Sequence, residues 1–268
     1  MKLLRYLAGM VLLLVLAASV LASWIAPADY ATQFREAPNA PACRRFPLGT
    51  DELGRDRLSR VLYGTRVSLL LAPSAALLST VLAALLGGVA GYAGGWLERV
   101  FLHVTDLFLS LPWLFLLLTV RAILPLNLPG WTSVSVTFAL LGLLGWPAPA
   151  RVVRAAVSSL RSSDFVLQAR ACGCFGFRLL LKHLVPNVRP VLLAQFCLAI
   201  PIFVLGEANL GLLGLGVSEP LPSWGNLLRG FENLSAVREN PWMAAPAVLL
   251  LLVTSCFHLT FPAEDHPS

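Results

Sequence analysis

The stretch that decides the fold class is Val67–Ala93, which reads VSLLLAPSAALLSTVLAALLGGVAGYA. It contains no Asp, Glu, Lys or Arg, and it exceeds the roughly 20 apolar residues that a helix needs to cross a hydrocarbon core of about 30 Å. Its apolar residues run on without the alternation of a half-buried strand. Because backbone polar groups in lipid must bond within their own element, the stretch predicts a transmembrane helix.

Five further segments share this composition, so the chain is expected to form about six membrane-spanning helices. They are Tyr6–Ala26, Val100–Leu124, Trp131–Ala150, Val188–Leu210 and Met243–Phe261. The whole chain is 57% hydrophobic and 13% charged, against about 45–50% and about 25% in average soluble domains. We therefore predict an all-α, polytopic membrane protein and exclude soluble, disordered and disulfide-scaffold classes.

The regions before and after these helices complete the expected organisation. Residues 1–65 are expected to hold an N-terminal anchor helix and an extracytoplasmic loop, residues 66–261 the transmembrane domain, and residues 262–268 a short tail. The first span could be a cleaved signal peptide, but it is longer than the apolar region of about 7–15 residues that signal peptides carry. We therefore expect an uncleaved anchor.

The loop at residues 151–187 is the most basic part of the chain. Arg151–Arg189 carries seven basic residues against one acid, Asp164. Excess Lys and Arg mark cytoplasmic loops, so this loop and both termini are predicted to be cytoplasmic. The polar stretch Pro27–Arg66 conflicts with that rule, because it is also rich in Arg and would lie outside. Nucleic acid is excluded as a partner, because no basic stripe with interleaved aromatic residues is present.

Two carboxylates lie within predicted spans, Asp106 and Glu207. A carboxylate in a membrane helix is costly and usually faces the bundle interior or a water-filled path. Each is therefore a candidate for the translocation path, or alternatively makes a helix–helix hydrogen bond or stays wet near the interface. Gly87, Gly91 and Gly95 recur on one helix face, which predicts close helix packing.

Catalytic motifs are missing from the sequence. A phosphate-binding loop needs a Lys that follows Gly, and neither Lys2 nor Lys182 does. No His-Glu-x-x-His pair and no Gly-x-Ser-x-Gly elbow occurs. We therefore expect no enzyme activity, and no cofactor or metal bound by this chain.

The basic loop has its own predicted structure. Ser162 to Gly173 has a capping Ser or Asp at its start and a glycine suited to end a helix. A second helical run, Phe175–Val185, is expected to stop at Pro186. This helix-turn-helix could meet a protein partner or lie as a basic interfacial helix on anionic lipid; position alone leaves both open.

The residues of this loop resemble a known family. Gln168-Ala-Arg-Ala-Cys-Gly173, followed by Lys182-His-Leu-Val-Pro-Asn187, is similar to the Glu-Ala-Ala loop of ABC importer permeases. Further blocks resemble the dipeptide, oligopeptide and nickel branch of that family. They are Pro47–Asp56, Ser59–Ser68, Gly91–Gly95, and Glu207–Gly216 with Pro222–Asn226, in matching order over roughly Phe46–Val253.

The resemblance implies the type I ABC importer permease fold and a set of functional residues. It implies a permease subunit in a bacterial-type inner membrane that forms the path for peptides or a related small solute. Its expected partners are a second homologous permease subunit, two ATP-binding subunits that carry ATP and Mg²⁺, an extracytoplasmic solute-binding protein and membrane lipid. The residues expected to couple to the ATPase are Phe165, Gln168, Ala169, Gly173, Phe175, His183, Pro186 and Asn187.

The chain departs from the family pattern at two places, and other functions compete. Leu167 stands where the family usually has Glu, and the tail from Phe257 lacks the family's usual Gly-Asp-Gly-Leu-Arg-Asp sequence. The alternative function is an ion-coupled secondary transporter that uses Asp106 and Glu207. A membrane scaffold without transport is the third.

Overall fold

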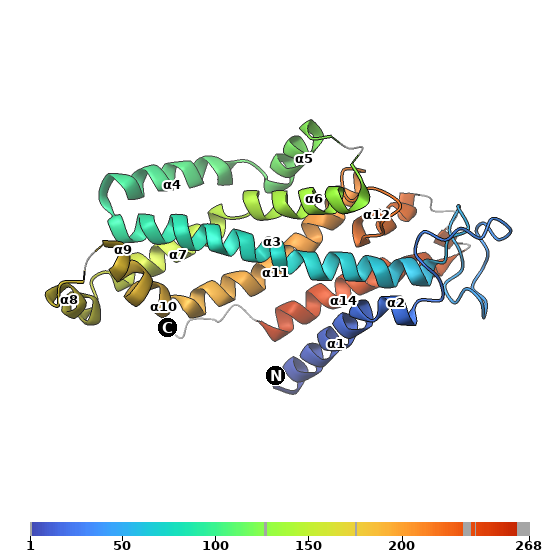
Figure 1. The fold of residues 1–268 in the computed structure, drawn as a ribbon, viewed down its shortest axis with the longest axis horizontal. Helices are drawn as coiled ribbons and strands as arrows, with labels where there is room; N and C mark the ends of the chain where they lie inside the picture. Colours follow the sequence, from blue (N-terminus) through green and yellow to red (C-terminus); the bar gives the residue numbers. More distant parts are fainter. Residues whose placement is uncertain (1, 126–127, 175, 233–236, 239, 262–268) are drawn as a thin grey trace.

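The computed structural model describes residues 2–125, 128–174, 176–232, 237–238 and 240–261. They form an elongated bundle of helices (Figure 1). One end of the bundle carries the irregular segment of residues 27–56 together with α12, and we call it the α12 end. The opposite end carries α8 and its neighbours, and we call it the α8 end.

The described residues contain helices and turns, and the one β-type pairing among them is an isolated bridge between Thr50 and Asp56. The longer helices are α1 (Lys2–Val20), α3 (Arg57–Ala93), α4 (Gly95–Ser110), α5 (Trp113–Ile123), α6 (Gly130–Leu144), α7 (Pro147–Leu160), α11 (Arg189–Leu212) and α14 (Ala245–Thr260). The shorter ones are α2 (Ala22–Ile25), α8 (Asp164–Ala171), α9 (Gly176–Leu179), the π-helical η1 (Leu180–Leu184), α10 (Val185–Asn187), α12 (Trp224–Leu228) and the 3-10 segments η2 (Arg229–Glu232) and η3 (Pro241–Ala244).

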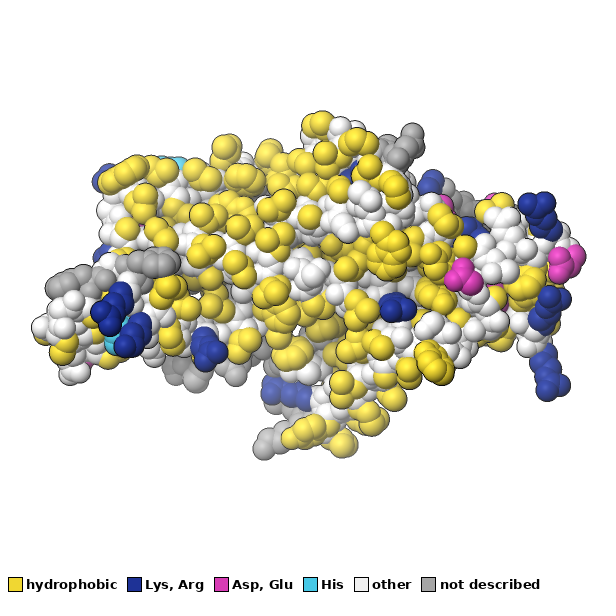
Figure 2. Space-filling view, viewed as in Figure 1, with side chains coloured by type: hydrophobic (Ala, Val, Ile, Leu, Met, Phe, Trp, Pro, Cys, Tyr) yellow, Lys and Arg dark blue, Asp and Glu magenta, His cyan; other side chains and the backbone are white. Residues whose placement is uncertain are grey.

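The number of candidate membrane spans agrees with the six predicted from the sequence if each of two bent helix pairs is counted as one span. Within the described residues, four helical stretches are long and apolar enough to cross a membrane: Leu3–Val20, Arg57–Ala93, Arg189–Leu212 and Pro241–Thr260. Two bent pairs, α4 with α5 and α6 with α7, raise the number to six if each pair is one span. The all-α polytopic class is confirmed. Figure 2 shows hydrophobic side chains over the middle of one face, with charged side chains gathered toward the two ends.

The prediction that Val100–Leu124 forms one continuous span was wrong. α4 ends at Ser110, and α5 begins at Trp113 at an angle of 83° to it. Pro112 lacks an N–H to continue the helix, and the residue before a proline is pushed to extended backbone, as Leu111 is with φ −88° and ψ 135°. The fourth span, Trp131–Ala150, also bends, by 40° between Leu144 and Pro147.

The second span begins earlier than predicted, at Arg57 rather than Val67. Asp56 is the N-cap of α3, and its Oδ2 accepts a hydrogen bond of 2.7 Å from the backbone N–H of Ser59. A capping carboxylate satisfies an otherwise unpaired helix amide. The polar loop expected over Pro27–Arg66 therefore ends at residue 56, and its last ten residues are the first turns of α3.

α3 is the central helix of the bundle and packs against α6, α7 and α11 (Figure 1). The predicted packing of its glycines is confirmed for two of three. A side chain at Gly87 would overlap the carbonyl oxygen of Ala150, and one at Gly91 would overlap that of Arg154, both on α7. Gly95 has no neighbour there and instead starts α4 with φ +62°, which favours glycine.

Two apolar clusters form the interior. The larger includes Phe138, Leu141 and Phe203 and fills the space between α3, α6 and α11 toward the α12 end. The smaller includes Val153, Val157 and Leu184 and lies beneath α8. The bundle is therefore packed to both ends, and each end supports a different kind of site.

Candidate functional site

At the α8 end, α8 is fastened to the bundle through one apolar face. Val166 is fully buried and Ala169 is 9% exposed, and both belong to the smaller apolar cluster, against which the half-buried Phe165 also packs. That cluster joins α8 to α3, α7 and η1. On the other face, Gln168 and Leu167 are exposed. The residues predicted to couple to an ATPase therefore divide between anchoring and exposed positions.

Gly173 ends α8 in the way the sequence predicts. Its φ of +81° is a left-handed conformation, and the N–H of Cys174 returns to the carbonyl of Ala169 at 2.9 Å. This is the usual glycine-dependent end of a helix. The Gly176 N–H donates to the Tyr92 hydroxyl at 3.0 Å, which ties the turn to α3. Phe175, another predicted coupling residue, lies outside the described residues.

The second helical run does not stop at Pro186, contrary to the sequence prediction. Residues 180–184 form a π-helical turn, and α10 continues through Pro186 to Asn187 before α11 begins at Arg189. A π turn widens the hydrogen-bond spacing, and this tolerates a residue that has no N–H to donate. The Asn187 side chain donates to the carbonyl of His183 at 2.7 Å, and Pro186 and Asn187 are exposed.

Acidic residues on α4 neutralise part of the positive charge of the basic loop. Arg154 on α7 donates to Glu98 on α4 at 2.9 Å, and Arg151 pairs with Asp106. Asp106 is 54% exposed beside Arg151 rather than enclosed in the bundle. Its role in a translocation path stays a prediction.

Glu207, the second predicted intramembrane carboxylate, is fully buried on α11. Its Oε2 accepts a hydrogen bond of 3.1 Å from the Ser68 hydroxyl on α3. A side chain at Gly225 of α12 would meet its Oε1 at 2.7 Å, so only glycine fits there. Glu207 thus holds α3, α11 and α12 together. Its partners differ from those of Asp106, and among the described residues no hydrogen bond joins the two carboxylates.

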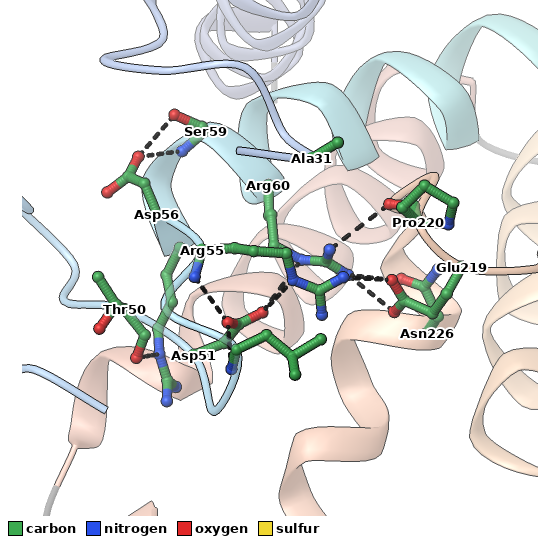
Figure 3. A network of polar contacts seen from close by, with 12 residues as sticks. Ala31, Thr50, Asp51, Arg55, Asp56, Ser59, Arg60, Glu219, Pro220 and Asn226 are labelled. Carbon is green, nitrogen blue, oxygen red and sulfur yellow. Dashed lines mark hydrogen bonds and ion pairs between the residues drawn. The ribbon is translucent and has the colours of Figure 1, made fainter. Parts of the chain in front are cut away.

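At the α12 end, a network of ion pairs joins the 27–56 segment to the loop after α11 (Figure 3). Arg55 donates to Asp51 at 2.6 Å and to Glu219 at 2.7 Å. Arg60, on the first turn of α3 and 3% exposed, donates to Glu219 at 2.8 Å and lies 3.8 Å from Asp51. Glu219 is more than 150 residues away in the chain, so these pairs close a long loop.

The carboxylates of this network favour the charged form of Arg55. Burial lowers the pKa of Arg55, but the hydrogen bond that Arg55 donates to Asp51 and the charge of Glu219 outweigh it and raise that pKa above its ordinary value. Two arginines and two carboxylates therefore neutralise one another. Paired charges of this kind can be buried where single charges cannot.

A cavity of about 600 Å³ lies next to the network at the α12 end. Asp51, Arg60 and Glu219 are among the residues that line it, as are Gly216, Arg121 and Trp242. A volume of this size is typical of small-molecule sites. No group of three or more His, Cys, Asp or Glu side chains within the described ranges is placed to hold a metal ion.

The sequence reasoning missed this second site. It treated the Arg-rich stretch Pro27–Arg66 as a conflict with the charge rule and did not predict that arginines there pair with acids. The acids that nearly balanced them were the available signal, because a balanced, Arg-rich loop is what an internal ion-pair network requires. The partner Glu219 could not be found that way, since its block lies in another part of the chain.

Comparisons with known proteins agree with this architecture. A sequence model of the family described as "Binding-protein-dependent transport system inner membrane component" matches residues 83–261. The chain is 30% identical over 256 residues to the dipeptide transport system permease protein DppC of Bacillus subtilis, covering 94% of this chain and 78% of that one. It is 34% identical over 256 residues to the di/tripeptide transport system permease protein DppC of Pseudomonas aeruginosa, covering 92% and 82%. It is 31% identical over 240 residues to the oligopeptide transport system permease protein OppC of Haemophilus influenzae, covering 88% and 75%.

Proposed function

The chain belongs to the family of binding-protein-dependent transport system inner membrane components, and we propose on that premise that it is the permease subunit of an ATP-driven peptide importer. The relatives are transport permeases rather than enzymes. The chain is accordingly a non-catalytic, multi-pass membrane component. Peptides are the proposed solute, because three of its relatives carry dipeptide, di/tripeptide or oligopeptide in their names.

The observation that carries the proposal is the two-faced attachment of α8. Its inner face, Val166 and Ala169, packs in the same cluster as Val153 and Val157 of α7. Its outer face presents Gln168, and the following turn presents Gly173. Packed interiors transmit displacement because they are dense. A partner that pushes on the exposed face would therefore move α7 with α8.

In this proposal the partner at α8 is an ATP-binding subunit, and ATP and Mg²⁺ act there rather than on this chain. The assembly would contain a second homologous permease, two such ATP-binding subunits and an extracytoplasmic solute-binding protein. The α8 end then lies in the cytoplasm and the α12 end outside. The basic loop at residues 151–187 supports this orientation, whereas the arginines of the 27–56 segment count against it under the same rule.

The orientation also places both ends of the described chain on the cytoplasmic side. α1 runs from Lys2 toward the α12 end, and α14 runs away from that end to Thr260 (Figure 1). An even number of crossings returns the chain to the side on which it started. The lipid-anchored alternative for the basic loop gains less support, because Arg151 and Arg154 are engaged by Asp106 and Glu98.

The experiment is a reconstitution with every proposed subunit and a labelled dipeptide. We expect uptake that requires ATP and falls to background when this chain is omitted. Uptake by the purified chain alone, driven by a proton or sodium gradient without ATP, would instead establish the ion-coupled alternative.

A matched pair of variants tests the role of α8 within the same assay. Gln168→Arg puts a bulky cation on the exposed face of α8, and we expect it to lower co-purification of the ATP-binding subunit and ATP-driven uptake together. Gln33→Arg makes the same change at an exposed position of the α12 end. It should leave co-purification of the ATP-binding subunit unchanged.

A further inference from the structure

Arg121 is a buried arginine that pairs with no carboxylate among the residues the structure describes. It lies in the last turn of α5 and is 1% exposed. Its Nη1 donates to the carbonyl of Pro125 at 3.1 Å, and its Nη2 lies 3.4 Å from the Ser133 hydroxyl. Its Nε has no hydrogen-bond partner. The guanidinium is therefore enclosed but only partly satisfied.

The other buried arginines differ from Arg121 because they are paired with carboxylates. Within the described part of the chain, Arg55 and Arg60 are the other buried ones, and each is paired with Asp51 and Glu219. A buried charge is normally retained only where an opposite charge or a full set of hydrogen bonds compensates it. Within the described residues Arg121 has neither, so its position calls for an anion that this part of the chain does not supply.

The space for such an anion lies beside it. Arg121 lines the cavity of about 600 Å³ at the α12 end, together with Gly214, Gly216 and Trp242. The cavity also holds Asp51 and Glu219, but these acids are already bonded to Arg55 and Arg60 (Figure 3). With Glu52 included, the lining carries five arginines against three acids, so the cavity has a net positive charge.

We propose that this cavity binds the carboxylate of the solute, with the Arg121 guanidinium as its charged donor. A guanidinium offers a planar edge that matches a carboxylate, and Nε is the unsatisfied atom of that edge. The volume suits a small solute rather than a single inserted side chain. The inference rests on the proposed function, since it places the site where a peptide would enter the permease.

The test measures binding directly on the full chain in lipid nanodiscs, without binding protein and without ATP. Equilibrium dialysis compares labelled dialanine with dialanine amide, which lacks the carboxylate. We expect saturable binding of dialanine and about ten- to hundredfold weaker binding of the amide, as loss of a charge-assisted hydrogen bond predicts. Equal affinity for the two in the unmodified chain overturns the proposal. This comparison needs no variant, so it stays decisive if a substituted chain fails to fold.

Variants then assign the effect to Arg121. Arg121→Gln should weaken dialanine binding by a similar factor and abolish the preference for acid over amide, whereas Arg121→Lys should keep part of that preference. Arg99→Gln removes an exposed arginine remote from the cavity lining and should bind as the unmodified chain does. If Arg121→Gln keeps the preference, the proposal is wrong.

Two further outcomes separate this inference from the proposed function. If dialanine does not bind but Arg121→Gln releases a partner subunit from the assembled transporter, the carboxylate comes from that partner and the solute site is overturned. If ATP-driven uptake requires the chain while acid and amide bind equally, the inference fails and the importer function stands.

Discussion

The two ends of the bundle are held by different forces. At the α8 end, Val166 and Ala169 fasten α8 through apolar contact, Arg170 adds a contact 6.0 Å from the centre of the Tyr92 ring, and within the described residues no ion pair joins α8 to the bundle. At the α12 end, Arg55 and Arg60 fasten the 27–56 segment to the loop after α11 through Asp51 and Glu219. Apolar contact is non-directional, whereas charged hydrogen bonds require fixed geometry. The α8 end is thus suited to move as a unit, and the α12 end to hold its shape.

The largest expected effect is at the α8 end. Val166→Asp places a carboxylate in the fully buried apolar cluster, where an uncompensated charge costs about 3–5 kcal/mol. We expect α8 to detach, so that limited proteolysis cuts within the 161–187 segment much faster. Leu167→Asp is the control one residue away, at a position 51% exposed. If both variants are cut at the same rate, α8 is not held by the apolar cluster.

The next effect is at the α12 end, where Trp224 is fully buried and its Nε1–H donates to the Thr65 hydroxyl at 2.9 Å. Thr65→Val preserves the shape but leaves the indole N–H unpaired, which costs about 1–3 kcal/mol. Thermal unfolding in detergent should show the loss. Thr119→Val removes a hydroxyl at an exposed position and should unfold as the unmodified chain does. Equal loss in both would mean that the Thr65–Trp224 bond contributes nothing specific.

A smaller effect concerns the start of α3. Asp56→Ala removes the N-cap acceptor of Ser59 and should cost about 1 kcal/mol. Asp56→Asn keeps a capping oxygen, so its unfolding midpoint should stay near that of the unmodified chain. Should the Asn variant lose as much as the Ala variant, the carboxylate charge rather than the cap is what stabilises the helix start.

The smallest effect is expected within the 27–56 segment itself. Glu36 and Arg45 form an ion pair of 3.8 Å whose side chains are 66% and 64% exposed. Glu36→Ala should change stability by less than about 0.5 kcal/mol, because exposed pairs contribute little. Glu219→Gln, which weakens the bonds to Arg55 and the buried Arg60, should lower the unfolding midpoint more. The reverse order would show that the network does not hold this end.

The sequence predicted the α8 end better than the α12 end, because the residues that start and end α8 lie close together in the sequence. The start of α8 at Asp164 and its end at Gly173 depend on residues within one or two turns. The number of spans also followed from composition. The α12 end depends on Glu219 meeting Arg55 and Arg60 across more than 150 residues, which no local pattern contains.

Two features of charged residues depended on partners that the sequence did not identify. Arg57 and Arg60 were assigned to a loop because charged residues lower the apparent hydropathy of a helix start, although tertiary pairing makes them compatible with α3. Asp106 pairs with Arg151 on the neighbouring α7, which agrees with the helix–helix contact that the sequence left open as one alternative. In each case the compensating charge lay on another element.

The most direct test of the account is site-specific photo-crosslinking in the assembled transporter. A photo-reactive amino acid replaces either Gln168 on the exposed face of α8 or Leu53, which is 52% exposed at the α12 end. The account predicts crosslinks from position 168 to the ATP-binding subunit and from position 53 to the extracytoplasmic binding protein. Crosslinks from position 168 to the binding protein, or none to the ATP-binding subunit in a transporter that still takes up peptide, would contradict it.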